Sequence, residues 1–208
     1  MDQAKMAGSV RERRRAETVH ELKDAALRQL AATGADGLSL RAVAREMGMS
    51  VQSIYHYFSS RDDLLTALVT DGHNALADAL EAARAEAPEH SAAVSTACRG
   101  YRSWALAHPA QFRLIYGTPV PGYTAPAGTL QAAQRVLRVF TETVFGTDDI
   151  IDLTPEELAL FVQSWAMLHG LTMLEITNHL NWTGQPHEVT FEAAVRRLVE
   201  DLHDVRRS

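Results

Sequence analysis

The sequence lacks the residue patterns that mark several kinds of protein. Its 208 residues contain one cysteine, Cys98, so no intrachain disulfide can form, which fits a reducing cytoplasm. Neither HExxH nor CxxC occurs, and no two histidines stand four apart on one predicted helix. We therefore expect no metal site and no cofactor. No nucleophile–base pair or glycine-rich phosphate loop is found, so we do not expect an enzyme.

Signals for membranes and secretion are also missing. The N-terminal residues MDQAKMAGSVRERRR have no apolar core, so we expect no signal peptide. No apolar run approaches the roughly 20 residues that are needed to cross a bilayer. Hydrophobic residues make up 46% of the chain, as in ordinary globular proteins. We expect a cytoplasmic protein with no membrane partner.

Strand patterns are scarce, because alternation of apolar and polar residues is absent. Apolar residues recur at helical spacing instead, and glycine and proline divide the chain into segments. The sequence predicts an all-α fold of about nine helices. They cover about residues 10–33, 40–47, 51–57, 61–86, a segment from beyond a break at Pro88 to 108, then 109–117, 129–145, 155–180 and 188–205.

Charge is distributed unevenly along the chain. The net charge is −6, but residues 1–70 carry +1 and residues 71–208 carry −7. The first fifteen residues alone carry +3. A surface that binds phosphates needs local positive charge rather than a basic total, so nucleic-acid binding by the N-terminal part is compatible with this sequence. We expect the acidic remainder to face away from DNA.

Residues 39–58 have the pattern of a helix-turn-helix. Ser39 and Ser50 stand where caps of the two helices belong, and Gly48 supplies the positive φ that a tight turn needs. Ile54 and Phe58, four residues apart, are expected to face inward. An ordinary helical hairpin with surface aromatic residues is the alternative, and the combination of caps, glycine turn and exposed tyrosines favours DNA binding.

The second helix of this motif would place its first residues on base edges. Gln52 and Ser53 can form hydrogen bonds with bases, and Val51 can contact a thymine methyl group. These three residues are the predicted base contacts.

Four further residues are predicted to contact DNA around this helix. The hydroxyl groups of Tyr55 and Tyr57 suit phosphate oxygens. Arg61 begins the next helix, where its side chain and the helix N-terminus could meet a phosphate. Arg41 could reach a phosphate or a guanine. The arginines at 11 to 15 could form an arm on the DNA or a solvated helix start.

The N-terminal part resembles the TetR family of bacterial regulators. The matching phrases are AATGADGLSL and LRAVAREMGMSVQSIYHYFSSRDDLLTALV, which include Tyr55, Tyr57 and Phe58. The resemblance covers residues from about 15 to 70. It implies DNA contacts at the seven positions named above. Position 51 is often lysine or another polar residue in this family, so Val51 restricts a base contact there to an apolar one.

The second half resembles a class of C-terminal domain named for a Trp-His-Gly signature, here Trp165, His169 and Gly170. The resemblance implies an all-α homodimer in which the last two helices, at about 155–180 and 188–205, form a four-helix bundle. It also implies that a ligand enters the C-terminal domain and alters the spacing of the two DNA-binding domains. Plain packing of Trp165 and His169 is the alternative to a pocket wall or dimer contact, and it is favoured.

Aromatic and apolar residues of the second half are candidates for a ligand cavity, because such pockets are mostly apolar. They are Trp104, Phe112, Tyr116, Tyr123, Phe161, Trp165, His169 and Met173. Membership of an ordinary core is the alternative for each of them. Cys98 is a redox sensor or, more simply, a small buried thiol.

Together these features predict a two-domain regulator. Residues 1–60 would form the DNA-binding domain and 61–208 a ligand-binding and dimerisation domain, with the helix at about 61–86 as the link. The predicted function is a dimeric repressor that a small apolar ligand releases from a double-stranded operator. The alternatives are an activator or corepressor response, a small helical enzyme, and an interaction module that does not bind DNA.

Overall fold

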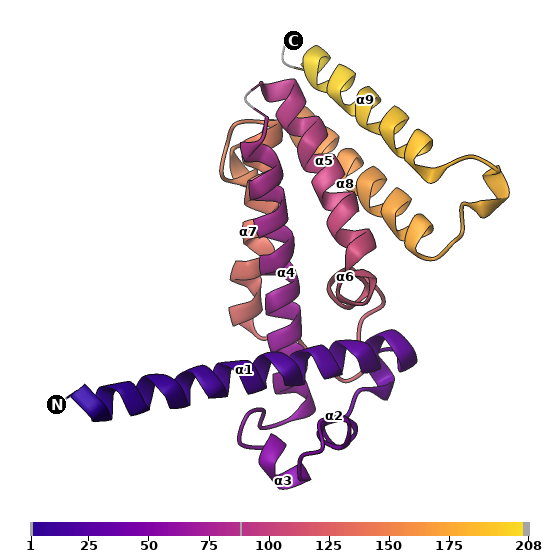
Figure 1. Cartoon of the computed structure of the whole chain (residues 1–208). Coiled ribbons are helices and arrows are strands. Elements are labelled where there is room, and N and C mark those ends of the chain that lie inside the picture. Colours follow the sequence, from indigo (N-terminus) through magenta and orange to yellow (C-terminus); the bar gives the residue numbers. More distant parts are fainter. Residues whose placement is uncertain (1, 88, 206–208) are drawn as a thin grey trace. The chain divides into compact units, whose positions relative to one another are not determined.

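A computed structural model describes residues 2–87 and 89–205, with side chains from Val10 onward. This part of the chain contains nine α-helices and no strand, which confirms the predicted all-α fold (Figure 1). The helices are α1 (Asp2–Thr33), α2 (Leu40–Glu46), α3 (Val51–Ile54), α4 (Arg61–Ala85), α5 (His90–Ala107), α6 (Pro109–Tyr116), α7 (Ala127–Val144), α8 (Pro155–Ile176) and α9 (His187–Val205). Three short 3₁₀ turns are η1 (Ala35–Gly37), η2 (Ile150–Asp152) and η3 (Asn181–Thr183).

Several helix ends differ from the sequence-based expectation. Helix α1 begins at Asp2 rather than near Val10. Helix α3 ends at Ile54 rather than Tyr57, because the following amides bond to the carbonyl three residues back, as in Tyr57 N to Ile54 O at 2.9 Å. Helix α8 ends at Ile176 rather than near Leu180. The predicted break at Pro88 lies outside the described residues.

The chain divides into two compact units. The first consists of the residues up to Val69 together with Ala110–Pro126, and the second consists of Thr70–Pro109 and the residues from Ala127 onward. The segment 110–126 therefore groups with the N-terminal residues, whereas the sequence-based division placed it in the C-terminal domain. Helix α4 contributes residues to both units.

The first unit has one apolar core beneath α1, α2, α3 and the start of α4. Leu22, Val43, Ile54 and Leu64 are fully buried in it. The segment 110–126 reaches the same core through Val120, which is 8% exposed. The Tyr123 hydroxyl lies 3.1 Å from the Thr66 hydroxyl of α4, and Leu114 packs against the core. This packing explains why 110–126 belongs to this unit.

In the second unit α5 packs against α7, α8 and α9. Helix α8 starts with a complete capping box, because Thr154 and Glu157 bond to each other's backbone amides at 3.2 and 2.9 Å. Arg102 of α5 makes two hydrogen bonds, of 2.7 and 2.6 Å, to the Glu175 carboxylate of α8. None of the helices in the described ranges is long and apolar enough to span a bilayer.

Candidate DNA-binding and ligand-binding sites

Serine caps define the starts of both helices of the helix-turn-helix. The Ser39 hydroxyl oxygen accepts a hydrogen bond from the amide of Ala42 at 3.1 Å. The Ser50 hydroxyl oxygen accepts one from the amide of Ser53, also at 3.1 Å. Each cap satisfies an amide that has no partner inside its helix. The predicted roles of both serines are confirmed.

The turn between the two helices depends on Gly48. Its φ is +64°, in the left-handed region where a side chain is strained. A Cβ atom there would meet no neighbour, so backbone conformation rather than space requires the glycine. The amide of Met49 donates to the Ala44 carbonyl at 2.8 Å, and the Met49 side chain packs against the core. The expected positive φ is confirmed.

The outer surface of α3 carries part of the predicted base-contacting set. Ile54 and Phe58 are 0% and 5% exposed, so they face inward as expected. Val51 is 40% exposed, and Gln52 is exposed beside it. Ser53 is half-buried, and its hydroxyl lies 2.7 Å from that of Ser50. The accessible part of the predicted base-contacting surface of α3 is therefore formed mainly by Val51 and Gln52.

The two predicted tyrosines have different surroundings. Tyr55 is 50% exposed, as a phosphate contact requires. Tyr57 is half-buried and packs against the core. The Arg15 guanidinium from α1 lies over the Tyr57 ring, 5.1 Å from its centre, and its Nη2 donates to the His56 carbonyl at 3.3 Å. The sequence placed Tyr57 on the outside and did not indicate this contact with α1.

The two predicted arginine contacts also differ. The Arg41 side chain is exposed, and no hydrogen bond or ion pair ties it to another of the described residues. The Arg61 guanidinium donates to the carbonyls of Ala35 at 2.8 Å and Leu38 at 3.1 Å. Its side chain is 29% exposed. In this structure Arg61 therefore holds the connection between α1 and α2, rather than pointing freely outward as a phosphate contact would.

The arginines at 11 to 15 lie within α1, so the structure gives this segment as helix. Arg11, Arg13 and Arg14 are exposed. They form a basic stretch on the first unit that is available to an anionic partner.

Of the predicted ligand-binding residues, Phe161 and Trp165 belong to an aromatic cluster in the second unit. The Trp165 ring lies 5.4 Å from Phe140, 5.8 Å from Tyr101 and 6.3 Å from Phe161, measured between centroids. The cavity beside this cluster has a volume of about 10 Å³. That is about the space of one water molecule, so the cluster is packed as a core in this conformation.

His169 lies at the edge of the same cluster. Its Nδ1 is 3.2 Å from the hydroxyl of the buried Tyr101. Burial lowers the pKa of His169 below its ordinary value, which favours the neutral imidazole. A neutral ring hydrogen-bonded to a tyrosine serves packing between α5 and α8, in line with the packing alternative for Trp165 and His169.

The other predicted ligand-binding residues are divided between the two units. Trp104 stacks on His108 at 5.2 Å in the second unit, where Met173 is half-buried. Phe112, Tyr116 and Tyr123 belong to the first unit. The Phe112 ring packs edge-on against Tyr116 at 5.4 Å, and burial raises the pKa of Tyr116. Which of these side chains contact a ligand remains a prediction.

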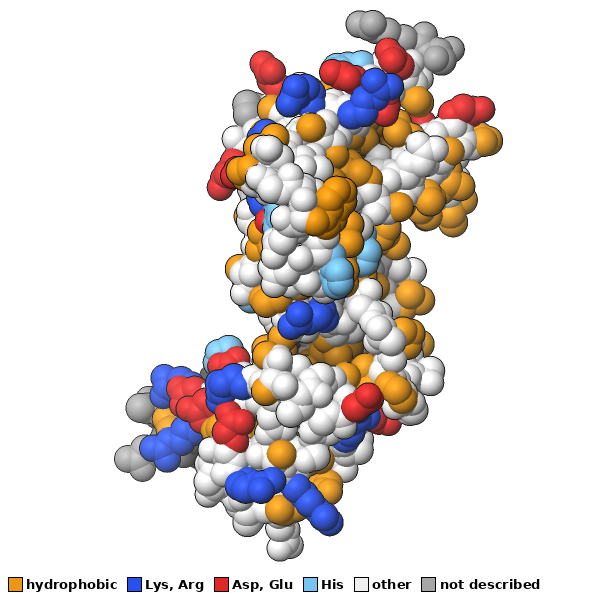
Figure 2. Space-filling view, turned by 90° about the vertical axis from the view of Figure 1, so that its right-hand side faces the viewer, with side chains coloured by type: hydrophobic (Ala, Val, Ile, Leu, Met, Phe, Trp, Pro, Cys, Tyr) orange, Lys and Arg blue, Asp and Glu red, His pale blue; other side chains and the backbone are white. Residues whose placement is uncertain are grey.

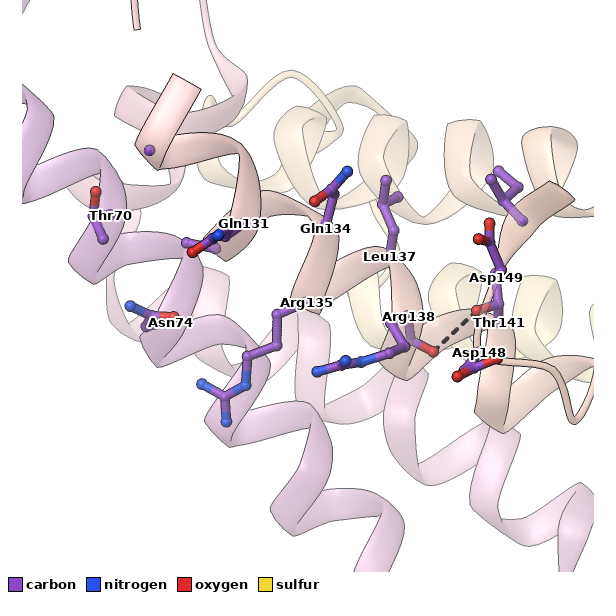
Figure 3. Close-up of a pocket in the computed structure, with 13 residues that line it drawn as sticks. Thr70, Asn74, Gln131, Gln134, Arg135, Leu137, Arg138, Thr141, Asp148 and Asp149 are labelled. Atoms are coloured by element: carbon purple, nitrogen blue, oxygen red, sulfur yellow. Dashed lines mark hydrogen bonds between the residues drawn. The ribbon is translucent and has the colours of Figure 1, made fainter. Parts of the chain in front are cut away.

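A groove in the second unit was not indicated by the sequence. It has a volume of about 720 Å³ and lies between α4 and α7 (Figure 3). Most of the residues that line it have polar side chains, among them Asn74 on α4, Gln131 and Gln134 on α7, and Asp148 beyond α7. Arg135 at this groove is bound by Asp78 and Glu81. None of the eight predicted residues lines it, because aromatic spacing gives no information about a polar surface.

Cys98 is buried, and burial raises the pKa of its thiol to about 12. A thiol that stays protonated at neutral pH is a poor nucleophile, which favours the simple buried thiol over a redox sensor.

The fold and the helix-turn-helix define a class of bacterial regulatory protein. Residues 22–68 match the model of "Bacterial regulatory proteins, tetR family". Residues 94–198 match the model of "Tetracyclin repressor-like, C-terminal domain". The two models together cover most of the described helices, and the chain belongs to the TetR family.

Curated relatives agree with this assignment. The chain is 43% identical over 141 residues to the HTH-type transcriptional regulator Rv1816 of Mycobacterium tuberculosis, covering 64% of this chain and 60% of that protein. It is 31% identical over 163 residues to the uncharacterized HTH-type transcriptional regulator Rv0681 of the same species, covering 74% and 68%. The chain thus spans 60% of the length of the first of these relatives.

Solved structures support the same fold over nearly the whole chain. The putative regulatory protein SCO4313 has a TM-score of 0.79 and 34% identity, and the match covers 90% of this chain and 97% of that one. A protein of unknown function from Rhodococcus sp. RHA1 has a TM-score of 0.74 and 29% identity, with coverages of 88% and 93%.

Proposed function

We propose that the protein is a dimeric transcriptional repressor that binds a partly palindromic DNA operator and is released by a small apolar ligand. The observation that carries this proposal is the helix-turn-helix itself. Two serine caps and a left-handed Gly48 hold α3 so that Ile54 is buried while Val51, Gln52 and Tyr55 are exposed. This is the arrangement that places the start of a recognition helix in the major groove.

In this proposal Gln52 is the principal base-reading residue. Its amide can donate to and accept from one base edge, and it stands at the start of α3 where such contacts are made. Val51 adds an apolar contact with a thymine methyl group. Arg41 and Tyr55 are exposed and supply phosphate contacts, which position the motif without reading sequence.

The proposed dimer forms through α8 and α9. Small and apolar residues spaced by four form a row along α8, in which Gly170 is half-buried and the others are exposed: Leu158, Val162, Ala166, Gly170 and Leu174. Leu158, Val162 and Leu174 are 40%, 55% and 40% exposed. A row with this spacing is a ridge suited to packing against a second helix. On the face drawn in Figure 2, hydrophobic side chains are exposed among the polar ones.

The proposed effector site lies in the C-terminal domain, around the aromatic cluster of Trp165. The cluster leaves only about 10 Å³, so an apolar ligand would bind a conformation in which these rings are separated. Such a ligand releases the DNA by no more than the difference of its affinities for the two conformations. Helix α4 runs from Arg61 to Ala85 through both units and is the continuous element by which one unit can influence the other.

The proposal is tested by titrating the protein with DNA that flanks its own gene, at several salt concentrations. We expect specific binding that weakens steeply with salt, because phosphate contacts release counterions. Equal binding to unrelated DNA, or binding that does not depend on salt, would contradict the proposed repressor function.

Two variants separate base reading from positioning in the same assay. Gln52→Ala is expected to change base preference by roughly 1–3 kcal/mol at one position of each half-site. Tyr55→Phe is expected to weaken binding to all sequences alike, because it removes only a hydrogen bond to a phosphate. If both variants weakened all sequences equally, Gln52 would not be a base-reading residue.

A further inference from the structure

The first unit contains a crevice that the helix-turn-helix does not use. Its walls are the end of α1 and the turn η1 on one side, and α6 with the loop after it on the other. Its volume is about 280 Å³. All of its lining residues belong to the same compact unit.

The floor of the crevice is apolar and well supported. Leu30 and Val120 are 7% and 8% exposed and are both part of the unit's core, against which Leu114 packs. Pro119 and Pro121 restrict the backbone of the loop that forms one wall. The alanine side chains at positions 35 and 110 are small, which leaves the space open.

Both walls are held in place independently of any ligand. The turn η1 is fixed by the hydrogen bond from Arg61 to the Ala35 carbonyl at 2.8 Å. The loop after α6 is fixed by Val120 in the core and by the Tyr123–Thr66 hydrogen bond at 3.1 Å. A preformed crevice lowers the cost of ordering a binding site, so it favours a small ligand.

Two opposite charges stand on the opposing walls. Asp36 is on η1 and Arg113 is on α6, and both line the crevice. Both side chains are exposed, and neither makes a hydrogen bond or ion pair with another described residue. The crevice therefore offers a carboxylate acceptor, a guanidinium donor and an apolar floor within one small space.

We propose that this crevice binds a small zwitterion with an apolar side chain, of the size of a free branched-chain or aromatic amino acid. The Arg113 guanidinium would donate a charge-assisted hydrogen bond to the carboxylate of the amino acid, and the Asp36 carboxylate would accept one from its ammonium group. The apolar side chain of the bound amino acid would pack against Leu30, Leu114 and Val120. A volume of about 280 Å³ is just below the usual range for pockets that bind drug-sized ligands, and it suits a smaller molecule of this size.

This site is separate from the proposed repressor function and from the proposed effector site, and it can be tested without DNA. A bound amino acid would bridge the segment 110–126 to the end of α1, and it would stabilise the first unit by mass action.

The experiment is isothermal titration of the full chain with L-leucine and L-phenylalanine, accompanied by 4-methylpentanoate and isopentylamine. The last two keep the apolar group but lack the ammonium or the carboxylate, respectively. We expect saturable binding of an amino acid in the millimolar range or tighter, because so small a ligand has few atoms to offset its lost freedom. Each single-charge analogue should bind about tenfold more weakly, since it makes one charged hydrogen bond fewer.

Three variants of crevice residues test where the amino acid binds, and a fourth variant, outside the crevice, is the control. Arg113→Gln and Asp36→Asn should each weaken amino-acid binding about tenfold. Ala110→Leu should abolish it by filling the crevice, while an unchanged helical circular dichroism spectrum shows that the variant folds. Arg196→Gln removes an exposed arginine of α9 and should leave binding unchanged.

Three results would overturn the proposal. One is the absence of saturation by about 20 mM of either amino acid. Another is binding that survives all three crevice variants, which would place the ligand elsewhere. The third is tighter binding of 4-methylpentanoate or isopentylamine than of the amino acids, which would show that the site does not recognise a zwitterion.

Discussion

Arg41 and Arg61 stand at the starts of α2 and α4, but their guanidinium groups have different surroundings. Arg41 is exposed and has no partner among the described residues. Arg61 is bonded to the carbonyls of Ala35 and Leu38 and is 29% exposed. The first is available for a phosphate, and the second joins α4 to the connection between α1 and α2.

This difference predicts distinct effects of removing each arginine. Arg61→Ala should lower the free energy of unfolding by about 1–3 kcal/mol, because two partly buried carbonyls lose a charged donor. It should weaken DNA binding with an unchanged salt slope. Arg41→Ala should leave stability unchanged within about 0.5 kcal/mol and should reduce the salt slope by about 0.9 for each phosphate that the variant no longer binds. Urea unfolding and salt titration of DNA binding measure both quantities.

The opposite result for Arg61→Ala would indicate that Arg61 contacts DNA. If Arg61→Ala reduced the salt slope and left the midpoint of urea unfolding unchanged, its hydrogen bonds to Ala35 and Leu38 would not be its main role.

Local features of the candidate site could be predicted from the sequence. The caps Ser39 and Ser50 and the turn at Gly48 depend on residues within a few positions, so a short pattern specifies them. The partners of Tyr57 and Arg61 could not be predicted in this way. Tyr57 meets Arg15, and Arg61 meets Ala35, from elements more than 20 residues away, and only the packed fold brings them together.

At the scale of helices, the sequence predicted their number and order but not all of their ends or partners. Helix α8 was recognisable from the Thr154–Glu157 capping box. The end of α3 at Ile54 was missed, because the change to three-residue hydrogen bonding has no strong signal in the residues. Apolar spacing also cannot distinguish a core from a pocket, so Trp165 was a candidate for both.

One ion pair joins three helices of the second unit. Arg102 of α5 and Glu175 of α8 are 17% and 14% exposed and are joined by two hydrogen bonds. The Arg102 guanidinium also lies 5.3 Å from the centre of the Phe191 ring on α9, and His187 of α9 lies 3.7 Å from Glu175. The hydrogen bonds to Glu175 raise the pKa of Arg102, so the guanidinium stays charged.

Breaking this pair should destabilise the second unit strongly. We expect Arg102→Met to lower the free energy of unfolding by about 3 kcal/mol, because it leaves Glu175 charged and largely buried. The control is Arg197→Met on α9, whose pair with Asp201 involves an arginine side chain that is 73% exposed. It should cost less than about 1 kcal/mol. Urea unfolding with a constant m-value measures both, and equal losses would contradict a special role for Arg102.

At the scale of the whole molecule, the row of α8 residues from Leu158 to Leu174 is the surface that we propose for the dimer. Apolar residues that remain exposed along one helix mark an interaction surface. Gly170 lies within this row, and a glycine inside a helix costs about 1 kcal/mol relative to alanine. A Cβ atom at Gly170 would meet no neighbour in the monomer, so the single chain does not require a glycine there. Close approach of a second helix would require it.

Gly170→Glu therefore tests the dimer without disturbing the fold of the chain. The added side chain has open space in the monomer, so we expect thermal stability of the single chain to be kept or increased. In a dimer packed through α8, the same carboxylate would be buried between two helices without a partner, which costs several kcal/mol. A cost of that size would raise the dissociation constant of a micromolar dimer enough to leave the chain monomeric at micromolar concentration.

The matched control for Gly170→Glu is Ala82→Glu, at an exposed position of α4, which introduces the same charge away from the row. Sedimentation equilibrium at about 10 µM should show a dimer for the native chain and for Ala82→Glu, and a monomer for Gly170→Glu. A monomeric native chain, or a Gly170→Glu dimer of native affinity, would exclude this surface as the dimer interface, because close packing of α8 against its copy leaves no room for the added carboxylate.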